Sequence, residues 1–146
     1  MAKRPALAAL LALALATPLQ AQWLEELRPL REVIGDGEAP VSYIATRCAA
    51  FFVASAELLD DQIDPEMANE VNGIVTLFLT TAADAMAAEG MSPEEAETAA
   101  EAEVIDLTAA YSARFSANIA AGGPAFAEDP VYLADNADCL AVLTGE

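Results

Sequence analysis

Apolar residues recur at three- and four-residue spacing along most of the chain, which is the pattern of helices that bury one face. Three prolines each follow a side chain that can cap a helix, at Asp64-Pro65, Ser92-Pro93 and Asp129-Pro130. A capping residue followed by proline is typical of a helix start. Glu95, three residues after Ser92, adds the second half of a capping box. These positions divide the apolar pattern into four main helices.

The four helices are predicted over residues 42–59, 65–89, 93–121 and 130–143. The second contains an uncharged stretch, residues 71–83, and we expect it to be the most buried element for that reason. Within it, the segment from Gly73 to Thr81 could also form a β-strand, because branched and aromatic residues suit a pleated surface. Helix and strand both remain open there. The glycines of Gly122-Gly123-Pro124 predict the end of the third helix.

Residues 22–40 carry a weaker pattern of the same kind. Apolar side chains are helix-spaced from Trp23 to Ile34, but Pro29 lies in the middle of the run. Proline removes a helical hydrogen bond, so we expect a short helix with a break, followed by a turn at Gly35-Asp36-Gly37. The whole pattern predicts an all-α fold, a small antiparallel bundle of about four helices with short loops.

The start of the chain is typical of a secretory signal peptide. Lys3 and Arg4 precede an uncharged run of alanine and leucine, and Pro18 follows that run. We expect cleavage after Ala21, with Ala16 as the alternative site. The apolar run is shorter than the ~20 residues of a spanning helix, so no stable membrane insertion is expected after cleavage. Residues 1–21 are thus predicted to be a signal peptide, and residues 22–146 a single acidic helical domain of the periplasm or the secreted fraction.

The formal charge is −18, with 24 acidic residues, six basic residues and no histidine. Cleavage would remove Lys3 and Arg4, leaving four basic residues against 24 acidic ones, a formal charge of −20. Nucleic acid and anionic membranes repel such a domain. A basic protein partner or a divalent cation would be attracted, and a solvated acidic surface that keeps the protein soluble explains the same composition. The pattern specifies no oligomeric state.

Two cysteines, Cys48 and Cys139, lie 91 positions apart. An even number of cysteines in an exported chain predicts a disulfide, which would join the first main helix to the last. The chain-entropy model gives such a loop about 4 to 4.7 kcal/mol of stabilisation. A zinc site would need further cysteine or histidine ligands, and a catalytic thiol would need a histidine base.

Without histidine, only carboxylate chemistry remains for a catalytic site. Four acids, Asp60, Asp61, Asp64 and Glu66, lie close together in the chain, and paired carboxylates can hydrolyse glycosides when their pKa values differ. A charged loop between helices explains them equally. Proline after Asp64 breaks the spacing of a calcium-binding EF-hand loop. We therefore assign no catalytic, cofactor-binding or metal-ligating residues and expect no enzyme.

Arg47 and Arg114 stand out because basic residues are scarce. Each is expected to form an ion pair that ties helices together. The alternative is that one of them binds a carboxylate or another small anion in a pocket with Tyr43, Tyr111 or Tyr132.

The sequence favours an exported, non-enzymatic helical interaction or binding protein of the bacterial periplasm. In size, compartment, helix content and cysteine count the chain resembles small periplasmic acid-stress chaperones of the HdeA type, although no motif carries residues across. That resemblance implies an alternative, a holdase that exposes apolar helix faces when its carboxylates are protonated near pH ~4. A carboxylate-dependent hydrolase is the third hypothesis.

Overall fold

The computed structural model describes residues 27–37 and 39–145, and these residues form helices and turns without any strand. The all-α prediction is therefore confirmed. The predicted signal peptide, its two cleavage sites and Trp23 lie outside the described residues.

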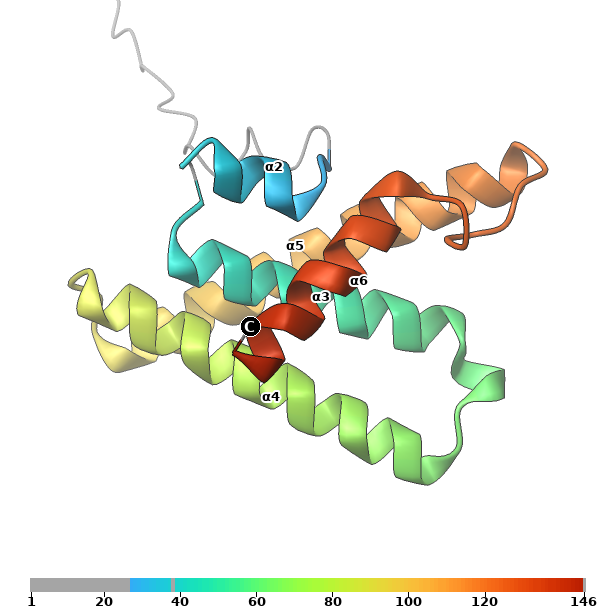
Figure 1. Cartoon of the computed structure of the whole chain (residues 1–146). Helices are drawn as coiled ribbons and strands as arrows, with labels where there is room; N and C mark the ends of the chain where they lie inside the picture. Colours follow the sequence, from blue (N-terminus) through green and yellow to red (C-terminus); the bar gives the residue numbers. More distant parts are fainter. Residues whose placement is uncertain (1–26, 38, 146) are drawn as a thin grey trace, which may run out of the picture.

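Five α-helices and one short 3₁₀ helix follow one another in the described chain (Figure 1). They are α2 (Leu30–Gly35), α3 (Val41–Leu58), η1 (Asp60–Gln62), α4 (Pro65–Ala88), α5 (Pro93–Ala120) and α6 (Pro130–Thr144). Each end of the four long helices lies within one residue of its prediction. The alternative of a strand from Gly73 to Thr81 is wrong, because this segment is the middle of α4.

The three predicted caps are present. The Asp64 side chain accepts a hydrogen bond from the N–H of Met67, and Asp129 accepts two from the first turn of α6. Ser92 forms a full capping box at the start of α5. Each cap satisfies backbone N–H groups that have no partner inside their helix, which explains why the chain starts new helices at these three points.

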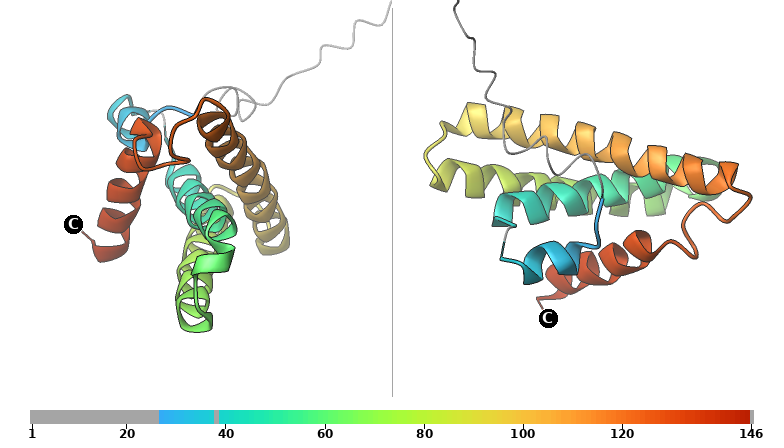
Figure 2. Two further views of the ribbon diagram at one scale, coloured as in Figure 1. Left: turned by 90° about the vertical axis from the view of Figure 1, so that its right-hand side faces the viewer. Right: turned by 90° about the horizontal axis from the view of Figure 1, so that it is seen from above.

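Helix α3 lies at the centre of the molecule. It packs on α4 and α5, which also pack on each other, and α6 packs on α3 and on α2. The end-on view of Figure 2 shows α5 and α6 on opposite sides of α3. Ten residues of α3 are buried but only four of α4, so the prediction that the uncharged helix is the most buried element is wrong.

The middle of α4, residues 71–83, carries no charge, and the hydroxyls on its exposed face bond within the helix. The hydroxyls of Thr76, Thr80 and Thr81 each donate to the carbonyl four residues earlier, at 2.8 to 2.9 Å. A hydroxyl bonded in this way already has a hydrogen-bond partner and does not need water as one. By length and composition α3 and α4 could each cross a membrane. Inside this fold 61% of the α3 window is buried, against 17% of the α4 window.

The predicted disulfide is confirmed. Cys48 of α3 and Cys139 of α6 are bonded, with their Cα atoms 5.4 Å apart, and neither side chain is exposed. An aromatic cluster fills the space beside it: Phe51, Tyr111, Phe115, Phe126 and Tyr132 stack or meet edge to face across α3, α5, α6 and the loop before α6. The helical layer of α6 is thus held to the core by both a covalent bond and aromatic packing.

Candidate functional site

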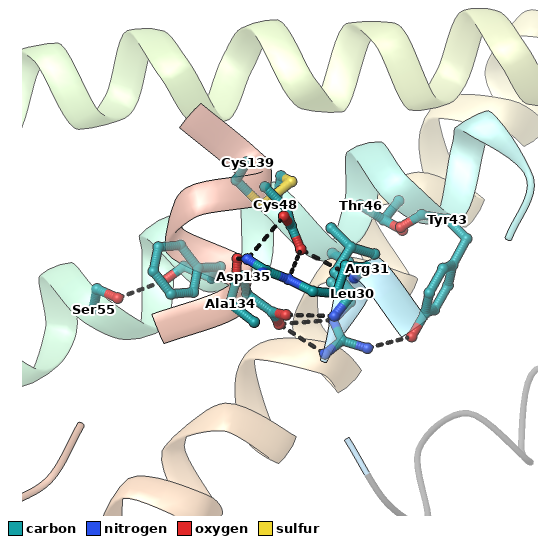
Figure 3. The surroundings of a disulfide bond; sticks show 12 residues. Leu30, Arg31, Tyr43, Thr46, Cys48, Ser55, Ala134, Asp135 and Cys139 are labelled. Carbon is teal, nitrogen blue, oxygen red and sulfur yellow. Dashed lines mark hydrogen bonds and ion pairs between the residues drawn. A yellow bond between two sulfur atoms is a disulfide. The ribbon is translucent and has the colours of Figure 1, made fainter. Parts of the chain in front are cut away.

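A buried ion pair lies beside the disulfide (Figure 3). The Arg47 guanidinium donates from Nη2 to the Asp135 carboxylate at 2.7 Å and from Nε at 3.0 Å. The two side chains are 1% and 0% exposed. The chain brings them together because Arg47 directly precedes Cys48, and Asp135 lies one helical turn before Cys139. The disulfide therefore fixes the two charges against each other.

The remaining hydrogen-bonding groups of the pair are occupied by other helices. Asp135 accepts a bond of 2.7 Å from the backbone N–H of Leu30 and another from the Tyr111 hydroxyl. Arg47 donates from Nη1 to the Tyr43 hydroxyl at 3.0 Å and from Nη2 to the carbonyl of Arg28. One ion pair thus joins α2 and the residues before it to α3, α5 and α6.

The electrostatics favour a charged arginine and a neutral tyrosine. Burial alone would lower the pKa of the Arg47 guanidinium, but Tyr111, Asp135 and Tyr43 outweigh it and raise that pKa above its ordinary value. Burial also raises the pKa of the Tyr111 hydroxyl, so this group stays protonated and donates to the carboxylate. These groups are enclosed, which leaves no face of Arg47 open to a ligand.

Arg114 lies in a different and more open place. Its Nε donates to Asp129 at 2.6 Å, and its side chain is 30% exposed. Asn118 donates to the same carboxylate at 2.8 Å. Burial alone would raise the pKa of Asp129, but hydrogen bonds from Asn118, from the backbone and from Arg114 lower it. The groups line a cavity of about 290 Å³ at the turn between α5 and α6.

The structure therefore separates the groups of the predicted anion pocket. Arg47 meets Tyr43 and Tyr111 in the enclosed network, whereas Arg114 contacts Asp129 and lines the cavity without a tyrosine. Both arginines pair with an aspartate of the α6 segment.

The other two arginines of the described chain are also paired with aspartates. Arg31 bonds to Asp138 at 3.2 Å, and Arg28 bonds to Asp36 at 3.2 Å. All four ion pairs of the described residues thus use aspartates of the α2 and α6 segments. No acidic residue of α3, η1, α4 or α5 takes part in an ion pair within this part of the chain.

The acids that the sequence places between the first two main helices lie at the surface. Asp60 and Asp61 belong to η1, and Asp64 is the cap of α4. Across residues 27–37 and 39–145, no group of three or more acids and cysteines is arranged to hold a metal ion. One of these three acids, Asp60, lines a groove.

This α3–α4 groove has a volume of about 230 Å³ and lies where η1 joins the two helices, at the right of Figure 1. Its apolar lining includes Val53 of α3, Ile63 and, on α4, Val71 and Val75. Glu57 and Asp60 line it as well, and both are exposed. An apolar recess with a carboxylate edge results.

Neither the partner of Arg47 nor the α3–α4 groove is predicted by the sequence. With 24 acids in the chain, nothing in composition singles out Asp135. A usable signal existed, because each member of the ion pair lies within one helical turn of a predicted half-cystine. The groove depends on how α3 and α4 diverge at η1, which periodicity does not encode.

No family model, curated protein or solved structure matches this chain.

Proposed function

We propose that the chain is an exported, non-enzymatic helical binding protein of the bacterial periplasm whose partner is a protein more basic than itself. The distribution of charge carries this proposal. The four arginines of the described chain are paired with four aspartates. The exposed acids of η1, α4 and the first half of α5 therefore have no arginine partner among the described residues. A basic partner surface would supply the missing positive charge and would steer association.

Two further features support the proposal. The disulfide is compatible with an oxidising compartment, in agreement with the leader-like residues at the start of the sequence. The closely placed ionisable groups, such as Arg47 and Asp135, bond to each other inside the fold, where they hold helices together instead of facing a substrate.

The test has two steps. The full sequence is expressed in a Gram-negative host, and mass spectrometry of the periplasmic product is expected to show cleavage after Ala21 or Ala16 with both cysteines oxidised. The oxidised product is then immobilised and exposed to periplasmic extract of the bacterium that encodes it. We expect a basic protein to be retained and to elute as salt rises, because exposed charge pairs are screened. Retention of no salt-sensitive basic protein would refute the proposal.

A second candidate function is that of an acid-stress holdase, and one observation favours it. Each ion pair that holds α6 and the turn before it uses an aspartate: Asp129 with Arg114, Asp135 with Arg47, and Asp138 with Arg31. Loss of these ion pairs would loosen α6 while the disulfide kept it tethered. The aromatic cluster against which α6 packs would then become available to clients.

Dye binding separates the two candidates. A holdase is expected to expose apolar surface reversibly at about pH 3 to 4 and to suppress client aggregation there. Irreversible precipitation, or client aggregation unchanged by the protein, would leave only the first candidate. As a control, Asp36→Asn removes an exposed ion pair outside α6. It is expected to bind dye at the same pH as the unmodified protein does.

A further inference from the structure

We infer that the α3–α4 groove is the docking site for a cationic segment of the protein partner, in which an apolar side chain is flanked by lysine or arginine. This inference rests on the proposed function and specifies where the partner binds.

The groove offers an apolar floor. Val53, Ile63, Val71 and Val75 line it, and all four are only half-buried within the chain. An apolar side chain that entered would remove part of their remaining exposed surface from water, which favours binding. The recess therefore favours an aliphatic or aromatic side chain of the partner.

The edge of the groove selects for positive charge. Glu57 and Asp60 line it, and Asp61, Asp64 and Glu66 are exposed nearby in the sequence. None of these acids has an ion pair among the described residues. The lining contains no basic residue, so a basic side chain beside the apolar one would meet uncompensated carboxylates.

A second copy of this chain does not fit as the occupant. Its formal charge is −18, so two copies repel each other. Within the described residues, each arginine already has an aspartate of its own chain. A basic segment of a different protein has neither disadvantage.

The experiment uses a displayed library of random linear peptides, selected on the oxidised protein. We expect the enriched peptides to contain an apolar residue flanked by lysine or arginine, and to bind less tightly as salt rises. Enrichment of peptides without basic residues, or no enrichment, would overturn the inference.

Four variants, compared two by two, locate the binding. The first is the double variant Glu57→Arg/Asp60→Arg, which reverses the charge of the groove edge and is expected to weaken peptide binding at least about tenfold. Its control is the double variant Glu97→Arg/Glu101→Arg, which makes the same change in net charge on exposed residues of α5. This control is expected to bind the peptides within about threefold of the unmodified protein. Equal losses in the two would show that only overall charge matters and would overturn the inference.

Two single tryptophan variants test whether the peptides occupy the groove itself. Asn72→Trp places a bulky ring at the exposed margin of the groove, whereas Asn69→Trp places it on α4 outside the lining. Only the former is expected to block the peptides, by at least about tenfold. All variants change exposed side chains, and unaltered circular dichroism and thermal unfolding would verify their fold.

Three other results would also overturn the inference. One is a dimer in sedimentation velocity that Asn72→Trp dissociates, since the groove would then hold a second copy. Another is binding to phosphatidylcholine vesicles that Asn72→Trp abolishes. The third is a captured periplasmic partner that binds all four variants as it binds the unmodified protein. In that last case the proposed function stands and the docking site alone fails, whereas capture of no basic protein removes both.

Discussion

The buried ion pair between Arg47 and Asp135 allows a quantitative test of how this fold is held together. In Asp135→Leu the guanidinium, 1% exposed, loses its counter-charge. Removing one member of a buried ion pair costs about 3 to 5 kcal/mol. A domain of this kind is stable by about 5 to 15 kcal/mol in total. The variant is therefore expected to lose a large part of its free energy of unfolding.

The assay is urea unfolding of the oxidised protein, followed by circular dichroism. Urea is preferred to guanidinium chloride because it does not screen charges. The control is Asp36→Leu, which removes an exposed pair with Arg28 and is expected to cost less than about 1 kcal/mol. Arg47→Met combined with Asp135→Leu removes both charges and is expected to be more stable than Asp135→Leu alone.

A milder variant covers the case in which Asp135→Leu does not fold. Tyr111→Phe removes one hydrogen bond to the carboxylate and one acceptor of Arg47, and is expected to cost about 1 to 3 kcal/mol. If Tyr111→Phe or Asp135→Leu changed stability no more than Asp36→Leu does, the assignment of the network as the main polar attachment of α6 would be refuted.

Three more outcomes are expected. Replacing Cys48 and Cys139 together by alanine should lower the free energy of unfolding by about 4 kcal/mol, measured by urea unfolding without reductant. Thr108→Val should raise the thermal midpoint, since the Thr108 hydroxyl is buried without a hydrogen-bond partner in the described chain; an unchanged or lower midpoint would contradict this. Burial raises the pKa of Glu103 above its usual 4.5, against a hydrogen bond from Thr46, so its ionisation destabilises the fold. Glu103→Gln should therefore be more stable than the unmodified chain at pH 7, by a margin that disappears as the pH falls through the raised pKa to below 4.5, in urea titrations across that range.

Much of the fold is legible in the sequence because its helix starts are chemically explicit. Asp64, Ser92 and Asp129 each precede a proline, and each caps a helix in the structure. Pro29 likewise stands immediately before α2. These signals involve only neighbouring residues, so the helix starts can be predicted without knowing how the helices pack.

The arrangement of the helices was less predictable, because a lack of charge is a poor measure of burial. The middle of α4 is uncharged, yet most of its residues are not buried, and the hydroxyls of Thr76, Thr80 and Thr81 bond within the helix. The α3–α4 groove and the Arg47–Asp135 pair depend on long-range geometry. Only the disulfide prediction, by bringing Cys48 to Cys139, carried information about that geometry.

The position of Arg47 in the chain also bears on the order of folding. Its counter-ion, Asp135, is synthesised 88 residues later. A nascent chain that contains only α2 to α5 would have to bury a guanidinium with no anion beside it. The helices made first therefore gain their full stability only once α6 has emerged and supplied the missing carboxylate.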